Sequence, residues 1–168
     1  MATIKFPGLK EYEKRLSTLG KEGKAIAEKA VYAGAAIIAD AVRANINALP
    51  AVKDEWGVVA YNNNWSAPLT ETAKKGLQDG FGISPTGNED GILNVKLGFD
   101  GYNDMKTKKY PKGQPNAIIA RSLESGSSIA KKRPFVAPAV RKTKKAAEET
   151  ILSSCAPQAA NIQRSWGI

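Results

Sequence analysis

Apolar residues recur at helical spacing over the first 49 positions of the chain. Leucine and tyrosine residues three or four positions apart predict a short helix that opens at Pro7-Gly8 and ends at Gly20. The spacing resumes after Gly20, now mostly with alanine and isoleucine, and predicts a longer helix that stops at Pro50. Because alanine dominates its apolar face, another element can approach closely. That face suits either an ordinary core or a contact with another subunit.

Residues 50–136 read as strands and loops instead. We expect a loop over 50–68 that holds a short strand at 57–61. The spacing of the glycines between 76 and 82 fits neither nucleotide-binding glycine motif. These glycines predict instead a turn that leads into a strand at 81–84. Residues 87–91 then predict a hairpin connection. Alternating apolar and polar residues over 93–99 predict a half-buried antiparallel strand.

Residues 100–116 are rich in lysine and show no periodicity, which predicts a long, exposed and mobile loop. An apolar run at 117–120 follows and leads into the segment 121–139. Beyond it, the spacing over 139–154 predicts a C-terminal helix that Pro157 breaks. The tail from 158 onward adds at most one or two helical turns.

The segment 121–139 is the one around which the chain is organised. It runs from Arg121 and Glu124 into a Gly126-Ser127 turn, then into a cationic triplet and a Pro-Phe-Val-Ala-Pro sequence. The two prolines restrict the backbone on either side of the aromatic residue. We therefore predict that Phe135 and Val136 are held rigidly before a helix that begins at Pro138, and that a partner-binding interface comprises Arg121, Glu124, Gly126, Pro134, Phe135, Val136 and Pro138.

Together these patterns predict an α+β fold in which N-terminal helices and a C-terminal helix pack on an antiparallel sheet of about four strands. The length of 168 residues favours a single domain over 1–168. It would have a helical part at 1–49, a sheet with long loops at 50–136 and a second helical part at 137–168.

The composition narrows the function classes. The chain has no histidine, and therefore lacks the commonest general base and metal ligand. Its neighbouring carboxylates, Asp54-Glu55 and Glu89-Asp90, are adjacent in sequence and point to different sides. We therefore expect no catalytic residues, no cofactor and no metal. No apolar run is long enough for a membrane span and no signal-peptide core begins the chain, so we expect a protein that is soluble and intracellular when made.

The net charge of +9 points to an anionic partner. The excess gathers in the second half of the chain, where we predict a basic partner-binding surface of Lys106, Lys108, Lys109, Lys112, Lys131, Lys132 and Arg133. The C-terminal helix also carries four cations in its first turns, facing the positive end of the helix macrodipole: Arg141, Lys142, Lys144 and Lys145. A nearby anion would relieve that arrangement, and a solvated polar face is the alternative.

An ordered set of short motifs resembles a known family. The set consists of the glycine-rich turn at 76–83, Val-Lys-Leu-Gly-Phe at 95–99, Leu-Glu-Ser-Gly-Ser at 123–127 and Pro-Phe-Val-Ala-Pro-Ala at 134–139. In this order they resemble the tail-completion, or tail-component, proteins at the neck of long-tailed bacteriophages. The resemblance covers about residues 8–150.

This resemblance implies a structural protein of the virion with no catalytic activity. The implied role is to form a ring, most simply a hexamer, at the head-tail junction of a phage or phage-like tail, as a tail-completion or tail-terminator protein. The implied partners are further copies of the chain, the tail tube protein and the head-side connector proteins. The alternative is a basic nucleic-acid-binding protein whose cations contact phosphates, including non-specific contact with DNA in the tail channel.

Overall fold

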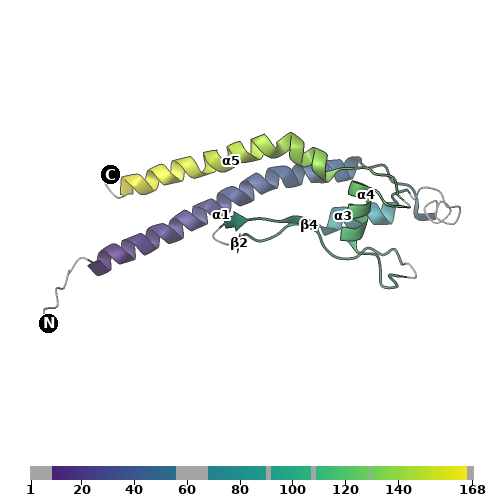
Figure 1. The fold of residues 1–168 in the computed structure, drawn as a ribbon, viewed down its shortest axis with the longest axis horizontal. Helices are drawn as coiled ribbons and strands as arrows, with labels where there is room; N and C mark the ends of the chain where they lie inside the picture. Colours follow the sequence, from purple (N-terminus) through teal and green to yellow (C-terminus); the bar gives the residue numbers. More distant parts are fainter. Residues whose placement is uncertain (1–8, 56–67, 90–91, 107–108, 129, 166–168) are drawn as a thin grey trace.

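The computed structural model describes residues 9–55, 68–89, 92–106, 109–128 and 130–165. Within these residues the chain forms helix α1 (Leu9–Ala48), helix α3 (Glu71–Gly80), a set of short strands, helix α4 (Asn116–Ser125) and helix α5 (Val136–Ser165). Figure 1 shows α1 and α5 running side by side, with α3 and α4 gathered near one end of the pair. The α+β class is confirmed.

Helix α1 is one continuous helix, so the predicted break at Gly20 is wrong. A glycine inside a helix costs up to about 1 kcal/mol relative to alanine, but it does not interrupt the hydrogen-bond ladder as proline does. The apolar spacing also continues in phase through Gly23, since Leu19, Gly23 and Ile26 keep the alternation of four and three. Helix α1 ends where Lys74 of α3 donates to the carbonyl oxygens of Asn47 and Leu49, at 2.8 Å each.

Helices α1 and α5 are antiparallel, and small residues let them approach closely. Near the start of α5, Asn45 of α1 donates to the Phe135 carbonyl at 2.7 Å. Further along α5, Gly34 lies against the side chain of Ile151, and a Cβ atom placed on Gly34 would be only 2.6 Å from its Cγ1 atom. The alanine-rich face of α1 therefore packs at least partly against the chain's own C-terminal helix.

Helix α5 is longer at both ends than the sequence predicts. It begins at Val136 rather than at Pro138 or 139, and its backbone remains helical through Pro157 to Ser165. Pro138 is in the first turn, where proline removes no helical hydrogen bond. Pro157 removes one, at a cost of about 3 kcal/mol, which the packing of α5 along α1 offsets.

The strands form a narrow two-stranded ribbon rather than one sheet of about four strands. Strand β1 (Phe81–Ile83) pairs antiparallel with β4 (Leu97–Phe99), and β2 (Gly87–Glu89) pairs antiparallel with β3 (Ile92–Asn94). Between the two pairs, residues 84–86 face only residues 95 and 96, which makes a bulge. The predicted strand at 93–99 is therefore split, and the predicted connection at 87–91 is mostly strand.

The glycine-rich stretch before this ribbon lies in helix α3, and not in the predicted turn. A Cβ atom on Gly76 would be 2.5 Å from the Oδ1 atom of Asn116, and one on Gly80 would collide with the Asp100 carbonyl and the Asn116 side chain. The glycines therefore allow α3 to pack against the start of α4 and the end of β4. The Asn116 side chain fixes this contact by donating to the Asp100 carbonyl at 2.9 Å.

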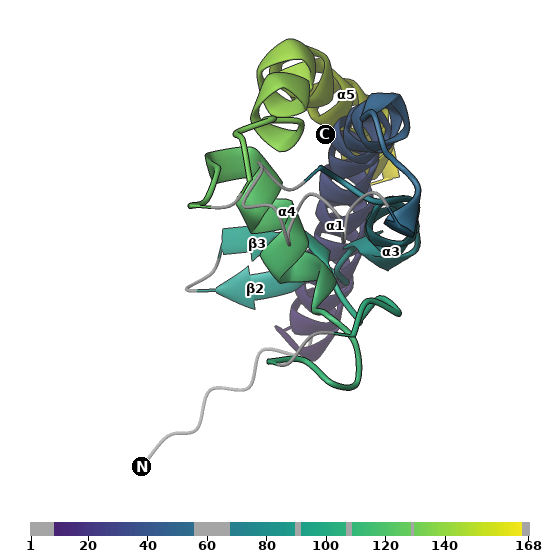
Figure 2. The same ribbon diagram turned by 90° about the vertical axis from the view of Figure 1, so that its right-hand side faces the viewer.

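Helix α4 covers the apolar run at 117–120 and the first five residues of the segment that follows, for which no helix was predicted. It buries Ile119, Ala120 and Leu123. These side chains join a core that α1, α3, β1 and the beginning of α5 also line: Ala39, Val42, Ile46, Leu49, Leu69, Ala73, Leu77, Phe81, Phe135 and Ala139. Figure 2 views this end of the molecule, with α5 above and α3, α4 and the hairpin below. The strand predicted at 57–61 lies outside the described residues.

We expect Gly34→Ala to destabilise the protein. The added methyl group must displace Ile151 or separate α1 from α5, and overpacking of this kind costs about 1 to 3 kcal/mol. Denaturant unfolding followed by circular dichroism measures the change.

Gly23→Ala is the matched control, because the same helix has nothing within 4 Å of a Cβ atom at that position. It should stabilise by about 0.5 to 1 kcal/mol through helix propensity alone. Equal stabilisation by both substitutions would contradict the close approach of α5 at Gly34.

Candidate functional site

The segment 121–139 connects α4 to α5 through a chain reversal. Helix α4 ends at Ser125, and Gly126 follows with a φ of 79°, a conformation that favours glycine. The loop then closes on itself, since the Ser127 amide donates to the Ala130 carbonyl at 2.9 Å. The Arg133 amide donates back to the Leu123 carbonyl of α4 at 2.7 Å. The reversal brings the start of α5 beside the last turn of α4.

The Glu124 carboxylate caps the N-terminus of α5. Its Oε2 atom accepts the amides of Phe135 and Val136, and its Oε1 atom accepts that of Ala137, at 2.9 Å each. These amides would otherwise have no helical partner, and the negative charge also faces the positive end of the helix macrodipole. Glu124 thus caps the helix although it lies eleven to thirteen residues before the amides that it accepts.

The same geometry lowers the pKa of Glu124. Partial burial is the largest single influence and favours the neutral acid, but the three amide donors and the nearby Lys132 charge together outweigh it. The pKa of Glu124 therefore lies below its ordinary value of 4.5. The capping group is ionised at neutral pH.

Phe135 lies in the chain's own core. Its side chain is 2% exposed, and its ring meets the Phe99 ring edge-on with centroids 5.8 Å apart. The ring therefore has almost no accessible surface, and membership of Phe135 in a partner-binding interface stays a prediction. Among the other predicted interface residues, Arg121 and Pro134 are exposed, and the half-buried ones are Glu124, Gly126, Val136 and Pro138.

The predicted basic surface falls into two groups. The first is in the loop after β4, where Lys106, Lys109 and Lys112 are exposed, and Lys108 lies outside the described residues. The second is in the reversal before α5, where Lys131 and Lys132 are exposed and Arg133 is half-buried. The sequence alone did not show that a helix, α4, separates the two groups along the chain.

The loop after β4 is anchored at its base, which the prediction of a mobile loop missed. Tyr102 pairs with Pro115 in an isolated antiparallel bridge, and the Asn103 amide donates to the Gln114 carbonyl at 3.0 Å. Asn103 is itself buried, and its side-chain oxygen accepts the Met105 amide at 2.9 Å. The lysines therefore extend from a fixed base.

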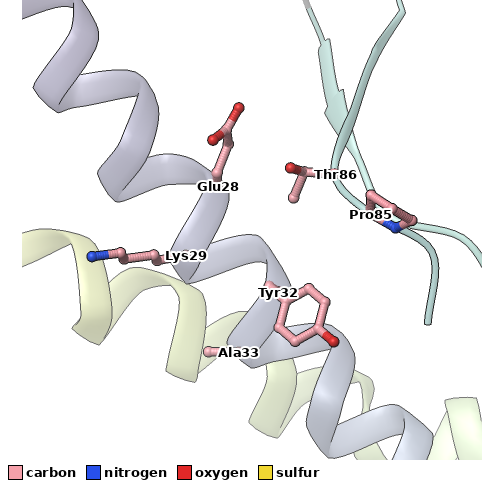
Figure 3. A pocket seen from close by; sticks show the side chains of 6 residues that line it. All are labelled: Glu28, Lys29, Tyr32, Ala33, Pro85 and Thr86. Carbon is pink, nitrogen blue, oxygen red and sulfur yellow. The ribbon is translucent and has the colours of Figure 1, made fainter. Parts of the chain in front are cut away.

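A shallow groove of about 430 Å³ lies between α1 and the hairpin bulge. Figure 3 shows Glu28 and Tyr32 of α1 on one side of this groove, with Pro85 and Thr86 on the hairpin side. Within the described ranges, no group of three or more histidine, cysteine, aspartate or glutamate residues could hold a metal ion, and no described helix is long and apolar enough to cross a membrane.

The sequence matches the family described as "Bacteriophage HK97-gp10, putative tail-component" over residues 10–126. The chain belongs to this family. The match includes α1, α3, the hairpin and α4, and the protein is therefore a phage tail component. No curated protein and no solved structure matches the chain significantly.

The HK97-gp10-like match ends at Gly126, two residues after the capping acid. Arg121, Glu124 and Gly126 thus lie within the matched region, whereas the Pro-Phe-Val-Ala-Pro sequence and α5 follow it. The Glu124 cap is the contact that ties α5 to the end of the HK97-gp10-like region.

We expect Glu124→Gln to destabilise the protein by about 2 kcal/mol at pH 7, since an amide offers one acceptor oxygen where the carboxylate offers two. Because the folded pKa is lowered, the carboxylate's contribution is fully present above about 4.5, the ordinary value, and is lost as pH falls through the folded pKa. The difference between the two proteins in free energy of unfolding should therefore be constant from about pH 7 to 5 and shrink below about 4.5.

Urea unfolding across this pH range makes the measurement. Glu148→Gln is the matched control, since the Glu148 side chain is 60% exposed and lies 3.8 Å from Lys144 on the surface. That control should change stability by less than about 0.5 kcal/mol. A Glu124→Gln variant with the same free energy of unfolding as the wild type at every pH would contradict the capping role.

Proposed function

We propose that the chain is a structural protein of the virion that forms a ring at the head-tail junction of a phage or phage-like tail, as a tail-completion or tail-terminator protein. Membership of a phage tail-component family is the observation that carries this proposal. The ring, its position at the neck and its hexameric state follow from the motif resemblance. We infer a structural rather than a catalytic role from the same family.

The segment around the α4–α5 reversal is suited to contact another subunit. Its backbone is fixed on one side by the Glu124 cap and on the other by the buried Phe135 ring. Arg121 and Pro134 are exposed on this fixed backbone. A surface that is already ordered loses little conformational entropy when a partner binds, which favours assembly. Phe135 supports this interface from inside the core.

The two groups of exposed cations are suited to contact an acidic protein surface. In the proposed tail, their partners are the tail tube protein and the head-side connector proteins. Charges at the rim of an interface mainly accelerate association and set orientation. Their contribution should weaken as salt rises, because exposed charges are screened over about 8 to 10 Å at physiological ionic strength.

Nucleic-acid binding is the second candidate, and the same exposed cations favour it: Lys106, Lys109, Lys112, Lys131 and Lys132. Binding to phosphates would be independent of sequence, and its affinity would fall steeply and linearly on a plot of log affinity against log salt. Contact with DNA in the tail channel would have the same signature. We favour the acidic protein partner because of the family to which the chain belongs.

We expect purified particles to contain the chain as a closed hexamer, and the purified protein to form the same ring at high concentration. Native mass spectrometry of the protein and quantitative cross-linking of particles measure the copy number. Arg121→Glu should weaken ring formation, because the residue is exposed on the proposed interface.

Lys142→Glu is the control, since it reverses a cation that is also exposed, on α5 and outside the proposed interface. It should leave the ring intact. A monomer or dimer stoichiometry in purified particles would contradict the proposed assembly.

A further inference from the structure

Two large apolar side chains lie exposed beside the same proline. Tyr102 is 70% exposed and Ile118 is 40% exposed. Tyr102 pairs with Pro115 in an antiparallel bridge, and the Ile118 amide donates to the Pro115 carbonyl at 3.1 Å. Both residues therefore adjoin Pro115 at the base of the lysine-rich loop, where α4 begins.

The backbone that carries this pair is well anchored. The buried Asn103 follows Tyr102 and is bonded across the loop base to Gln114. Thr70, at the start of α3, donates to the Met105 sulfur at 3.2 Å. On the other side, Ile119 and Ala120 of α4 are buried in the core. Both exposed side chains therefore stand on ordered backbone, although neither contributes to the core.

Exposed cations lie near this apolar pair along the chain. Lys106 and Lys112 are exposed in the loop that Tyr102 and Pro115 close. Arg121 is also exposed and follows Ile118 by three positions on α4, which places both side chains on one face of the helix. An exposed apolar centre with tyrosine and arginine, within a charged rim, has the composition of a binding hot spot.

We propose that Tyr102 and Ile118 are the apolar anchors of a docking surface for an acidic protein of the tail, in which Lys106, Lys112 and Arg121 form the rim. The proposal rests on the proposed function and specifies the chemistry of one partner: an apolar pocket surrounded by carboxylates. Charge complementarity selects this partner. A second copy that presented this same surface would bring the cations of the two rims together.

The apolar anchors also distinguish this partner from DNA. A phosphate backbone attracts the lysines but offers no apolar pocket for an aliphatic side chain. An aromatic ring can stack on a base, whereas Ile118 has no π face with which to do so. A surface that served phosphates alone would gain nothing from exposing Ile118.

The test measures binding of the purified protein to tails from the parent phage or prophage assembled with this chain's gene deleted. Tyr102→Ala and Ile118→Ala should each weaken binding about tenfold, mainly through faster dissociation, as truncation of a hot-spot residue does. Neutralising Lys106 and Lys112 should instead slow association and reduce the dependence on salt. Leu152→Ala is the matched control, since Leu152 is 71% exposed on α5, away from this surface, and should bind like the wild type.

Thermal unfolding of each variant verifies that the fold is intact, and random-sequence duplex DNA serves as a second probe. If the wild type binds tails and both alanine variants bind equally well, the apolar anchors are wrong while the proposed function stands. If the wild type binds no tails, the proposed function fails together with this inference. If Tyr102 and Ile118 are needed for binding DNA and not for binding tails, the nucleic-acid function replaces the docking surface.

Discussion

The connection between α4 and α5 depends on one carboxylate. Glu124 accepts the amides of three successive residues at the start of α5, each at 2.9 Å. The direction of α5 is thereby tied to the last turn of α4, and the second of the three capped residues begins α5. The first capped residue is Phe135, whose ring is buried against Phe99 and whose carbonyl accepts Asn45 of α1. A single ionised group therefore links α4, α5, the hairpin and α1.

The capping carboxylate also explains the cations at the beginning of α5. From the sequence, these charges face the positive end of the macrodipole and call for a nearby anion. The structure supplies one from the chain itself, because Glu124 occupies the helix N-terminus. Two of the cations, Lys144 and Lys145, also lie 3.8 and 3.9 Å from Glu148 and Glu149, one turn further along. An external anion is not needed to explain the sequence of α5.

The sequence predicted the elements that depend on local pattern. The class of fold, the strand at Phe81 and the general position of the long helices follow from periodicity, and the short motifs identified the family. The continuation of α1 through Gly20 was also present in the pattern, because the spacing of three and four residues stays in phase across Gly23. The prediction placed a helix end at Gly20, although the only obstacle to a helix there is the conformational cost of glycine.

Other features depend on contacts between distant residues, which periodicity does not encode. The glycines of α3 are explained by Asn116, forty positions after Gly76, and the cap of α5 is explained by an acid on another helix. The prediction that Phe135 belongs to an interface came from the two prolines that flank it. Prolines indicate a rigid backbone, but they do not indicate where the ring packs, and the ring is buried. Tyr102 and Ile118 are close only because both adjoin Pro115 in the folded chain. The sequence therefore predicted which types of residue occur at the candidate site, but it did not predict how they are arranged in space.

The account holds that an ionised Glu124 side chain orders the segment from which α5 begins. The most direct measurement is a ¹³C NMR titration of the Glu124 carboxyl group, recorded together with the amide shifts of Phe135, Val136 and Ala137. The account predicts a midpoint below 4.5, the ordinary value, with the three amides shifting at the same midpoint as their acceptor is protonated. A midpoint at or above 4.5, or amides that do not titrate with the carboxyl group, would contradict it.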